Sequence, residues 1–243
     1  ALMIAVASLA SVGFLSDRMR AGLEQMYGHN AEDVFYYLTL YNEAYPQPPE
    51  PEDADIRGIL RGMHLYSPAS DGEGLPAQIL ASGVSVPWAL KAQQLLADRW
   101  GVRADVWSVT SWNELRRDGL AVDEWNWLHP EEPARVPFVT QSLADRSGPV
   151  VAVSDYMRAV QDQIRDWVPG DFASLGTDGF GLSDTRGALR RHFHVDAESI
   201  AVRVLTMLAE RGQMDRSEVA AAIKEFDLLD VRAADPGQGM GDA

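Results

Sequence analysis

The chain has 243 residues, of which 46% are hydrophobic, enough to bury the core of one large or two small globular domains. Its net charge of −15 and isoelectric point near 4.6 argue against a general nucleic-acid-binding protein, because such proteins carry a basic face. The absence of cysteine excludes disulfide bonds, redox CxxC pairs and thiolate zinc sites, and it suits a cytoplasmic protein.

The first fifteen residues, ALMIAVASLASVGFL, are almost wholly apolar. This stretch is shorter than the roughly 20 apolar residues that span a bilayer, and no basic segment precedes it. We therefore predict neither a membrane-spanning helix nor a secretory signal peptide. Two interpretations of residues 1–18 stay open, a divergent buried helix and a segment that is not authentic sequence.

The next segments are typical of the end of one domain followed by a linker. Residues 18–26 are predicted to end a helix that stops at Gly28. Residues 34–41 are rich in β-branched and aromatic side chains and are predicted to form a strand covered on both faces. Residues 46–53 read PQPPEPED, and these prolines exclude a helix or a central strand. We place the domain boundary in a linker at 46–55.

Beyond the linker, short apolar runs alternate with helix-start signals. The predicted strands cover residues 78–81, 104–109, 136–140, 150–153 and 172–175. Helices are predicted to begin at Gly83 and Ser85, at Ser111 in a capping box with Glu114, at Ser154, at Ser183 or Asp184, at Asp196 and at Asp215. This alternation predicts an α/β domain over residues 56–230, with a mostly parallel twisted sheet and helices on both faces, followed by a frayed tail at 231–243.

A loop with three glycines, Gly176, Gly179 and Gly181, follows the last predicted strand. Glycine tolerates positive φ, so this loop can turn sharply, and a β-branched side chain would be costly at Gly179 if that residue has positive φ. The spacing G-x-x-G-x-G differs from the dinucleotide fingerprint G-x-G-x-x-G and argues against nucleotide binding. Because open α/β sheets meet ligands or neighbours beyond the carboxyl ends of their strands, we predict a domain or subunit contact here. Asp178 and Asp184 are assigned turn and cap roles rather than contact with a cationic partner.

Histidine and tryptophan side chains are the remaining candidates for chemistry. His192 and His194 are spaced to bind a metal from a strand, but without a suitable third ligand a helix-end cation and a surface histidine are favoured. His129 could act as a general base, although a hydrogen-bonded structural role is favoured. Trp125 and Trp127 are predicted to fill a packing gap rather than stack on a ligand. We assign no catalytic, cofactor-binding or metal-binding residue.

Seven segments resemble one protein family, in the same order along the chain. They are similar to the homodimeric pyruvate dehydrogenase decarboxylating component, a thiamine-diphosphate enzyme of the transketolase superfamily, and they extend from about residue 19 to 226. The segments are GLEQMYG at 22–28, DVFYYLTLYNEAYPQP at 33–48, VWSVTSWNELRRDG at 106–119, WNWLHP at 125–130, PARVPFV at 133–139, SDYMRAVQDQIRDWVP at 154–169 and GTDGFGLSDTRGALRRHFHVD at 176–196.

The resemblance implies that residues 1–45 end a pyrimidine-binding domain and that residues 56–230 form a transketolase-like C-terminal domain. The whole enzyme would decarboxylate pyruvate with thiamine diphosphate and Mg²⁺, and reductively acetylate the lipoyl group of dihydrolipoyl acetyltransferase, as a cytoplasmic homodimer. The family's GDG motif for the diphosphate is absent from this chain, so the part seen here is expected to support the dimer and the rim of the active site without catalysis. The alternative is a non-catalytic α/β module for subunit association.

Overall fold

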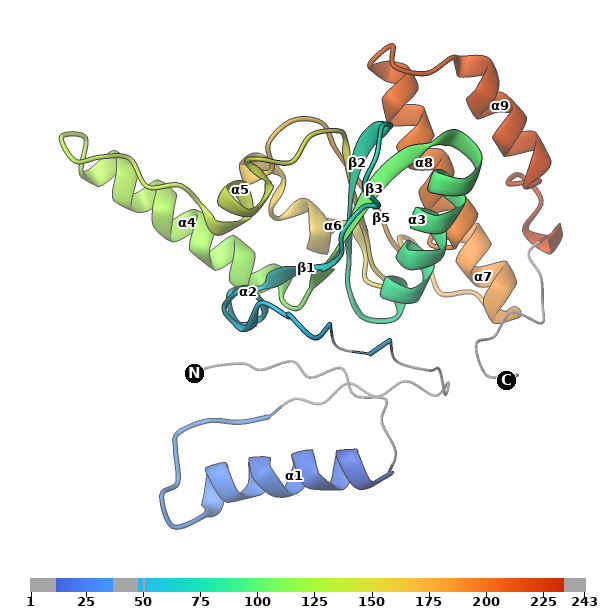
Figure 1. Cartoon of the computed structure of the whole chain (residues 1–243). Coiled ribbons are helices and arrows are strands. Elements are labelled where there is room, and N and C mark those ends of the chain that lie inside the picture. Colours follow the sequence, from blue (N-terminus) through green and yellow to red (C-terminus); the bar gives the residue numbers. More distant parts are fainter. Residues whose placement is uncertain (1–11, 37–47, 50, 234–243) are drawn as a thin grey trace. The chain divides into compact units, whose positions relative to one another are not determined.

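The computed structural model describes residues 12–36, 48–49 and 51–233 (Figure 1). The chain divides into two compact units, Ala1–Pro49 with Gly237–Ala243, and Glu50–Pro236. Each unit is described by itself. Within the described ranges, no helix is long and apolar enough to cross a membrane.

The first unit contains α1 (Val12–Tyr27), which ends at Gly28 as predicted. Tyr36 packs its ring against Gly22 of this helix, and its hydroxyl donates a hydrogen bond to Gln25. Residues 34–36 are not a strand, so the prediction of a strand is wrong for them, and the rest of the predicted strand lies outside the described residues.

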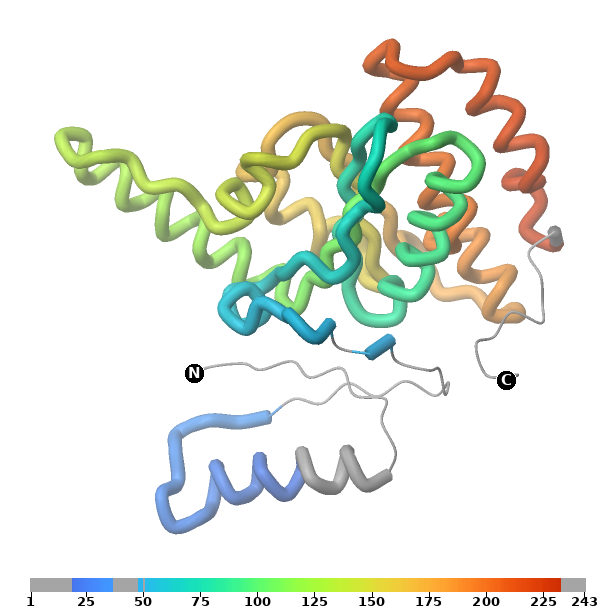
Figure 2. Tube along the Cα trace, viewed as in Figure 1, coloured from blue at the N-terminus to red at the C-terminus, as the bar shows by residue number. Residues whose placement is uncertain are grey.

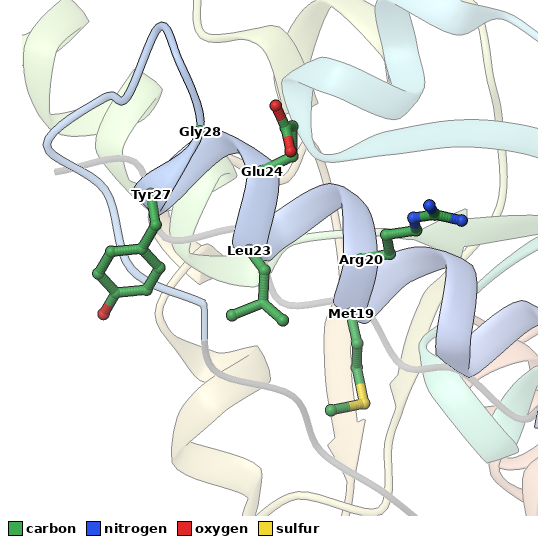
Figure 3. Close-up of a pocket in the computed structure, with 6 residues that line it drawn as sticks. All are labelled: Met19, Arg20, Leu23, Glu24, Tyr27 and Gly28. Carbon is green, nitrogen blue, oxygen red and sulfur yellow. The ribbon is translucent and has the colours of Figure 1, made fainter.

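One face of α1 carries an exposed apolar stripe that runs from Met19 to Tyr27. Met19, Leu23 and Tyr27 lie four residues apart, and each is at least half exposed. They line a shallow depression of about 520 Å³, and Figure 3 shows them pointing to the same side of the helix while Glu24 points away.

The second unit is built on a five-stranded sheet in the order β1-β3-β2-β4-β5. Its strands are β1 (Met63–Ser67), β2 (Leu75–Ala81), β3 (Val102–Val109), β4 (Val150–Val153) and β5 (Phe172–Leu175). All neighbours pair in parallel except β1, which runs antiparallel to β3 at one edge. The predicted mostly parallel sheet is therefore confirmed. The antiparallel edge strand β1 was not predicted.

Helices and short 3₁₀ turns connect the strands. They are α2 (Ile56–Arg61), η1 (Gly83–Ser85), α3 (Val86–Trp100), α4 (Trp112–Leu128), α5 (Phe138–Leu143), α6 (Arg158–Asp162), η2 (Arg165–Trp167), α7 (Arg186–His192), α8 (Ala197–Glu210), α9 (Arg216–Glu225) and η3 (Val231–Ala233). The trace turns back between α8 and α9, so these helices lie side by side (Figure 2).

Apolar side chains cover both faces of the sheet, as predicted. On one face, α4, α5 and the segment before β5 form a core cluster with alternate strand residues: Met63, Leu80, Trp107, Val109, Trp112, Leu115, Val139, Leu143, Val150, Ala152, Ile164 and Val168. Because successive strand residues point to opposite faces, Ile79 and Val151 face the other layer. That layer consists of the helices α3 and α8, which pack against each other (Figure 1). Of the strands, α3 contacts β3 and α8 contacts β4.

Side-chain caps start three helices where the sequence placed them. Ser111 accepts a hydrogen bond from the Glu114 amide at 3.1 Å, and Asp196 accepts one from the Ser199 amide at 3.0 Å. Asp215 accepts one from the amide of Ser217. The hydroxyl of Ser217 also donates to Asp215, and these two hydrogen bonds from Ser217 lower the pKa of the Asp215 carboxyl because they favour its charged form.

Two predicted elements near α5 and α6 are wrong. Residues 136–140 were predicted as a strand, but α5 begins at Phe138, whose amide donates to Asp118 of α4 at 2.6 Å. Ser154 was predicted to cap a helix, but its hydroxyl is buried in a contact with Ser82, and α6 begins later, at Arg158.

The start of α7 also differs from its prediction. Thr185, rather than Ser183 or Asp184, is the cap, and its hydroxyl accepts a hydrogen bond from the Ala188 amide at 3.3 Å. Asp184 instead accepts one from the amide of Thr185, which is a turn role of the predicted kind. The cap of α7 therefore lies one residue after Asp184 and two residues after Ser183, the two predicted positions.

Candidate functional site

The parallel strands end together at one edge of the sheet, where hydroxyl groups follow β2 and β4. Ser82 after β2 donates a hydrogen bond to Ser154 after β4, with 2.8 Å between the oxygens. The indole nitrogen of Trp112 donates to Ser82 at 3.0 Å, and the amide of Tyr156 donates to Ser154 at 3.2 Å. This network joins the ends of two strands to the start of α4.

These hydroxyls are unsuited to nucleophilic catalysis. A serine nucleophile needs an adjacent base and access to substrate, whereas Ser82 is 6% exposed and Ser154 is fully buried. The carboxylate of Asp155 lies 3.5 Å from the Ser154 oxygen, the weakest contact of the group. The network therefore holds the strand ends in place.

The glycine loop after β5 is fastened to the loop after β4. The Thr177 amide donates to the carbonyl of Tyr156 at 2.9 Å, and the Thr177 hydroxyl donates to that of Asp155 at 2.7 Å. The amide of Arg158 donates to Asp178 at 3.0 Å. A side chain at Gly176 would meet the Tyr156 carbonyl at 2.5 Å, so this close approach requires glycine.

Four large apolar side chains stand on these two fastened loops, and we call them the edge patch: Tyr156, Met157, Phe180 and Leu182. Phe180 is 96% exposed, and the other three are between 44% and 55% exposed. Exposed apolar side chains on loops at a strand-end edge are typical of a surface that meets another surface. The edge patch supports the predicted contact role of the glycine loop.

Replacing Gly179 by valine is expected to lower the free energy of unfolding by about 1–3 kcal/mol, the cost of a β-branched residue in a sparsely populated backbone region. Gly179 has φ of 94°, the condition on which this cost depends, and an added Cβ would meet nothing within 4 Å. Chemical denaturation measures the change. If the loop meets a neighbouring domain or subunit, Gly179→Val also weakens that contact.

Gly181→Val is the matched control, because Gly181 lies in the same loop without positive φ and its Cβ would also meet nothing within 4 Å. We expect it to be near neutral, within about 0.5 kcal/mol. Equal losses from both substitutions would contradict a conformational requirement at Gly179.

The structure does not bring His192 and His194 into a metal site. His192 ends α7 and lies edge-on to Phe193, with 4.9 Å between ring centres, and His194 has φ of 57° in the turn before α8. Across the described residues, no group of three or more histidine, aspartate or glutamate side chains is placed to hold a metal ion. Phe193, between the two histidines, is half-buried.

His129 has the structural role that was favoured for it. Its Nδ1 lies 2.9 Å from the Trp125 carbonyl at the end of α4, and its ring stacks on Trp125 with 3.7 Å between centres. The Arg135 guanidinium lies 3.3 Å from the centre of the same indole ring. Trp127 differs from its prediction: it is 71% exposed and fills no gap, because this half of α4 extends beyond the sheet (Figure 1).

A buried arginine links three helices, which the sequence analysis did not detect. Arg191 is 4% exposed and donates to the carboxylate of Asp196 at the start of α8. It also donates to the carbonyl of Phe226 after α9 at 2.8 Å, and it lies 3.5 Å from Glu198. Arg191 lies in the last turn of α7, and its partner after α9 carries no sequence signal.

A second buried polar group lies in β3. Asp105 is 6% exposed. Its carboxylate accepts a hydrogen bond from the Ala69 amide at 2.8 Å and one from the Gln78 side-chain amide at 3.0 Å. Arg146 pairs with it at 3.3 Å, and Trp107 donates to Gln78 at 2.8 Å. Every charge here is satisfied, so the group fastens β2, β3 and two loops and has no free acid or base.

A further cavity of about 370 Å³ lies beside the edge strand β1, between the approach to α2 and α5. Tyr66 lines it, and burial raises the pKa of the Tyr66 phenol. Asp53 and Asp55 line the same cavity. No local pattern in the sequence indicates this cavity, because its walls come from segments far apart in the chain.

Comparison with known proteins identifies the family to which this chain is related. The profile of the transketolase-like C-terminal domain family matches residues 62–196, more than half of the chain. The pyruvate dehydrogenase E1 component of Mycolicibacterium smegmatis is 56% identical over 216 residues, and that of Escherichia coli K12 is 44% identical over 211 residues.

These alignments cover 89% and 86% of the chain but 23% of each relative, so the chain spans about a quarter of the length of the relatives it matches. Among solved structures, a transketolase from Leishmania mexicana aligns with a TM-score of 0.48 and 18% identity, over 85% of this chain and 25% of that one.

Proposed function

Since the chain belongs to the family of transketolase-like C-terminal domains, we propose that it is the C-terminal part of a pyruvate dehydrogenase E1 component. The observation that supports this most strongly is the 56% identity to the Mycolicibacterium smegmatis E1 component over 216 residues. The whole protein would decarboxylate pyruvate with thiamine diphosphate and Mg²⁺ and transfer the acetyl group to the lipoyl group of dihydrolipoyl acetyltransferase.

In this proposal, the chain contributes structure to the enzyme rather than catalytic groups. The edge patch and the fastened loops beneath it would meet a neighbouring domain or the second subunit of a homodimer, at the rim of the active site. The rigidity of these loops supports such a role, because a pre-ordered surface loses little conformational entropy on contact.

The proposed domain organisation follows the same relationship. Residues 1–45 would end the pyrimidine-binding domain, 46–55 would be the linker, 56–230 the C-terminal domain and 231–243 its tail. The exposed apolar stripe of α1 supports this, since a helix with such a stripe normally packs against further residues of its domain.

The described residues do not fit thiamine diphosphate and Mg²⁺. They contain no group of three or more metal-binding side chains, and the strand-end hydroxyls at the carboxyl edge are already bonded to one another. The sequence also has no GDG motif. We therefore assign no catalytic, cofactor-binding or metal-binding residue to this chain, and the cofactor would bind elsewhere in the longer protein.

The experiment compares this chain with the longer protein encoded by its gene. Titration calorimetry with thiamine diphosphate and Mg²⁺ should give no saturable isotherm for the chain, and a saturable one for the longer protein. The longer protein should also release CO₂ from pyruvate and acetylate a lipoyl domain. A clear isotherm for the chain would overturn the domain assignment.

The second candidate, a free-standing α/β association module, is favoured only by the edge patch. It predicts that no GDG motif precedes Ala1 in frame, and that no pyruvate-dependent CO₂ release is found.

The proposal of a pyruvate dehydrogenase E1 component includes a cytoplasmic location, which a chain without cysteine suits. It includes neither nucleic acid nor a membrane among the partners.

A further inference from the structure

A small pocket lies along α8, between the residues after α9 and the end of β5. It has a volume of about 250 Å³. Ser199, Val202, Arg203 and Thr206 line it from α8, and their spacing of three and four residues places them on one face of that helix. The pocket therefore follows α8 for about 10 Å, at 1.5 Å per residue.

Apolar side chains form most of its walls. Val202 and Leu228 are less than a tenth exposed, and Ile223 and Leu175 complete the surface around them. A ligand that enters such a pocket gains by burying apolar atoms.

Two polar side chains of the pocket, Ser199 and Arg203, have unused hydrogen-bonding capacity, whereas the Thr206 hydroxyl donates to the Val202 carbonyl at 2.7 Å. The Ser199 hydroxyl is buried and has no hydrogen-bond partner in the described part of the chain, although buried hydroxyls are normally bonded. Arg203 is half-buried, and no carboxylate of the described residues pairs with its guanidinium. His194 lies at the same end, in the turn that precedes α8.

The electrostatics of the pocket favour an anion. Its lining includes Arg203 and His194 but no acidic residue, in a chain whose net charge is −15. The nearest carboxylates in sequence, Asp196 and Glu198, are both engaged by Arg191. Ser199 lies in the first turn of α8, where the helix dipole also favours negative charge.

Its size selects a small ligand. The 250 Å³ volume exceeds the roughly 150 Å³ of a cavity that holds benzene and is below the roughly 300 Å³ at which drug-sized pockets begin. We propose that this pocket binds a small monocarboxylic acid with a short branched chain. The carboxylate contacts Ser199 and Arg203, and the apolar chain lies among Val202, Ile223 and Leu228. This site does not depend on the activity proposed above.

The test uses the full-length protein and 3-methylbutanoate, with 3-methylbutanamide as its neutral counterpart. Titration calorimetry should show saturable binding of the acid that is at least about tenfold tighter than that of the amide, because charge-assisted hydrogen bonds to arginine are the stronger kind. Arg203→Gln should remove this preference. Arg216→Gln, at an exposed arginine of α9 that does not line the pocket, should leave it unchanged.

Ser199→Ala separates binding from folding. Removing a buried hydroxyl that makes no hydrogen bond should leave the unfolding temperature unchanged or raised, while it weakens binding of the acid by about threefold to tenfold. The proposal is overturned if the acid does not bind, if acid and amide bind equally, or if binding survives both Arg203→Gln and Ser199→Ala and so belongs to another site.

Discussion

Replacing Arg191 by methionine is expected to lower the free energy of unfolding by about 3–5 kcal/mol, the usual cost of breaking a buried ion pair from one side. Arg191 is 4% exposed and Asp196 is 5% exposed, so the substitution leaves a carboxylate in the interior without its cation. The Phe226 carbonyl also loses its donor, which loosens the turn after α9. Urea denaturation measures the loss.

Two further variants identify the cause. Arg216→Met removes an exposed arginine and should change stability by less than about 0.5 kcal/mol. Adding Asp196→Asn to Arg191→Met removes the uncompensated charge, while asparagine keeps the cap of α8. We expect this double variant to be more stable than Arg191→Met alone. A double variant that is less stable would show that the charge of Asp196 is not the source of the loss.

Gly148→Ala is expected to destabilise the chain by about 2–6 kcal/mol, from backbone strain and overpacking together. Gly148 has φ of 95°, and an added Cβ would lie 2.0 Å from the carbonyl oxygen of Pro76 in β2. Neither backbone can yield, because the next residues pair β4 with β2 through the Gln78 amide and the Pro149 carbonyl at 2.9 Å.

Gly72→Ala is the matched control, since Gly72 also has positive φ, 130°, but an added Cβ there would meet nothing within 4 Å. It should cost only the strain, about 1–3 kcal/mol. The difference between the two free energies of unfolding isolates the contact with β2. If the two variants lose the same amount, the close approach of the backbones contributes nothing.

Local signals account for the parts of the fold that the sequence predicted. The caps at Ser111, Asp196 and Asp215 each bond an amide two or three residues ahead, so the residues that form the cap are visible in one short window. The strands β3, β4 and β5 are apolar runs between such signals, and they were found for the same reason.

The errors come from partners that are distant in the sequence. The start of α5 depends on Asp118, twenty residues before Phe138, and Ser154 is engaged by Ser82, 72 residues away. The apolar residues at 136–140 were therefore assigned to a strand, although residues 138–143 form a helix. Trp127 was wrongly predicted to fill a packing gap, because the sequence alone does not show whether another element faces that side of α4.

The candidate site was predictable only in outline. The glycine loop could be derived from the spacing of the glycines, but the spacing does not show that Gly179, and neither Gly176 nor Gly181, has positive φ. The edge patch could not, because it requires the loops after β4 and β5 to be neighbours. The pocket along α8 was missed for the same reason, since β5, α8, α9 and the turn at His194 each contribute to it.

The central position of β2 determines the order in which the sheet can assemble. Gln78 of β2 meets β3 at a separation of 27 residues, through Asp105, but Ser82 meets the residue after β4 at a separation of 72. Closing the longer loop costs about 0.9 kcal/mol more in chain entropy, so β2, α3 and β3 should form first. At roughly 5–20 residues per second of synthesis, the open edge of β2 would wait on the order of several seconds for β4. During that interval the nascent chain exposes the amides and carbonyls of its own central strand, and this is when it is most open to mispairing with another chain.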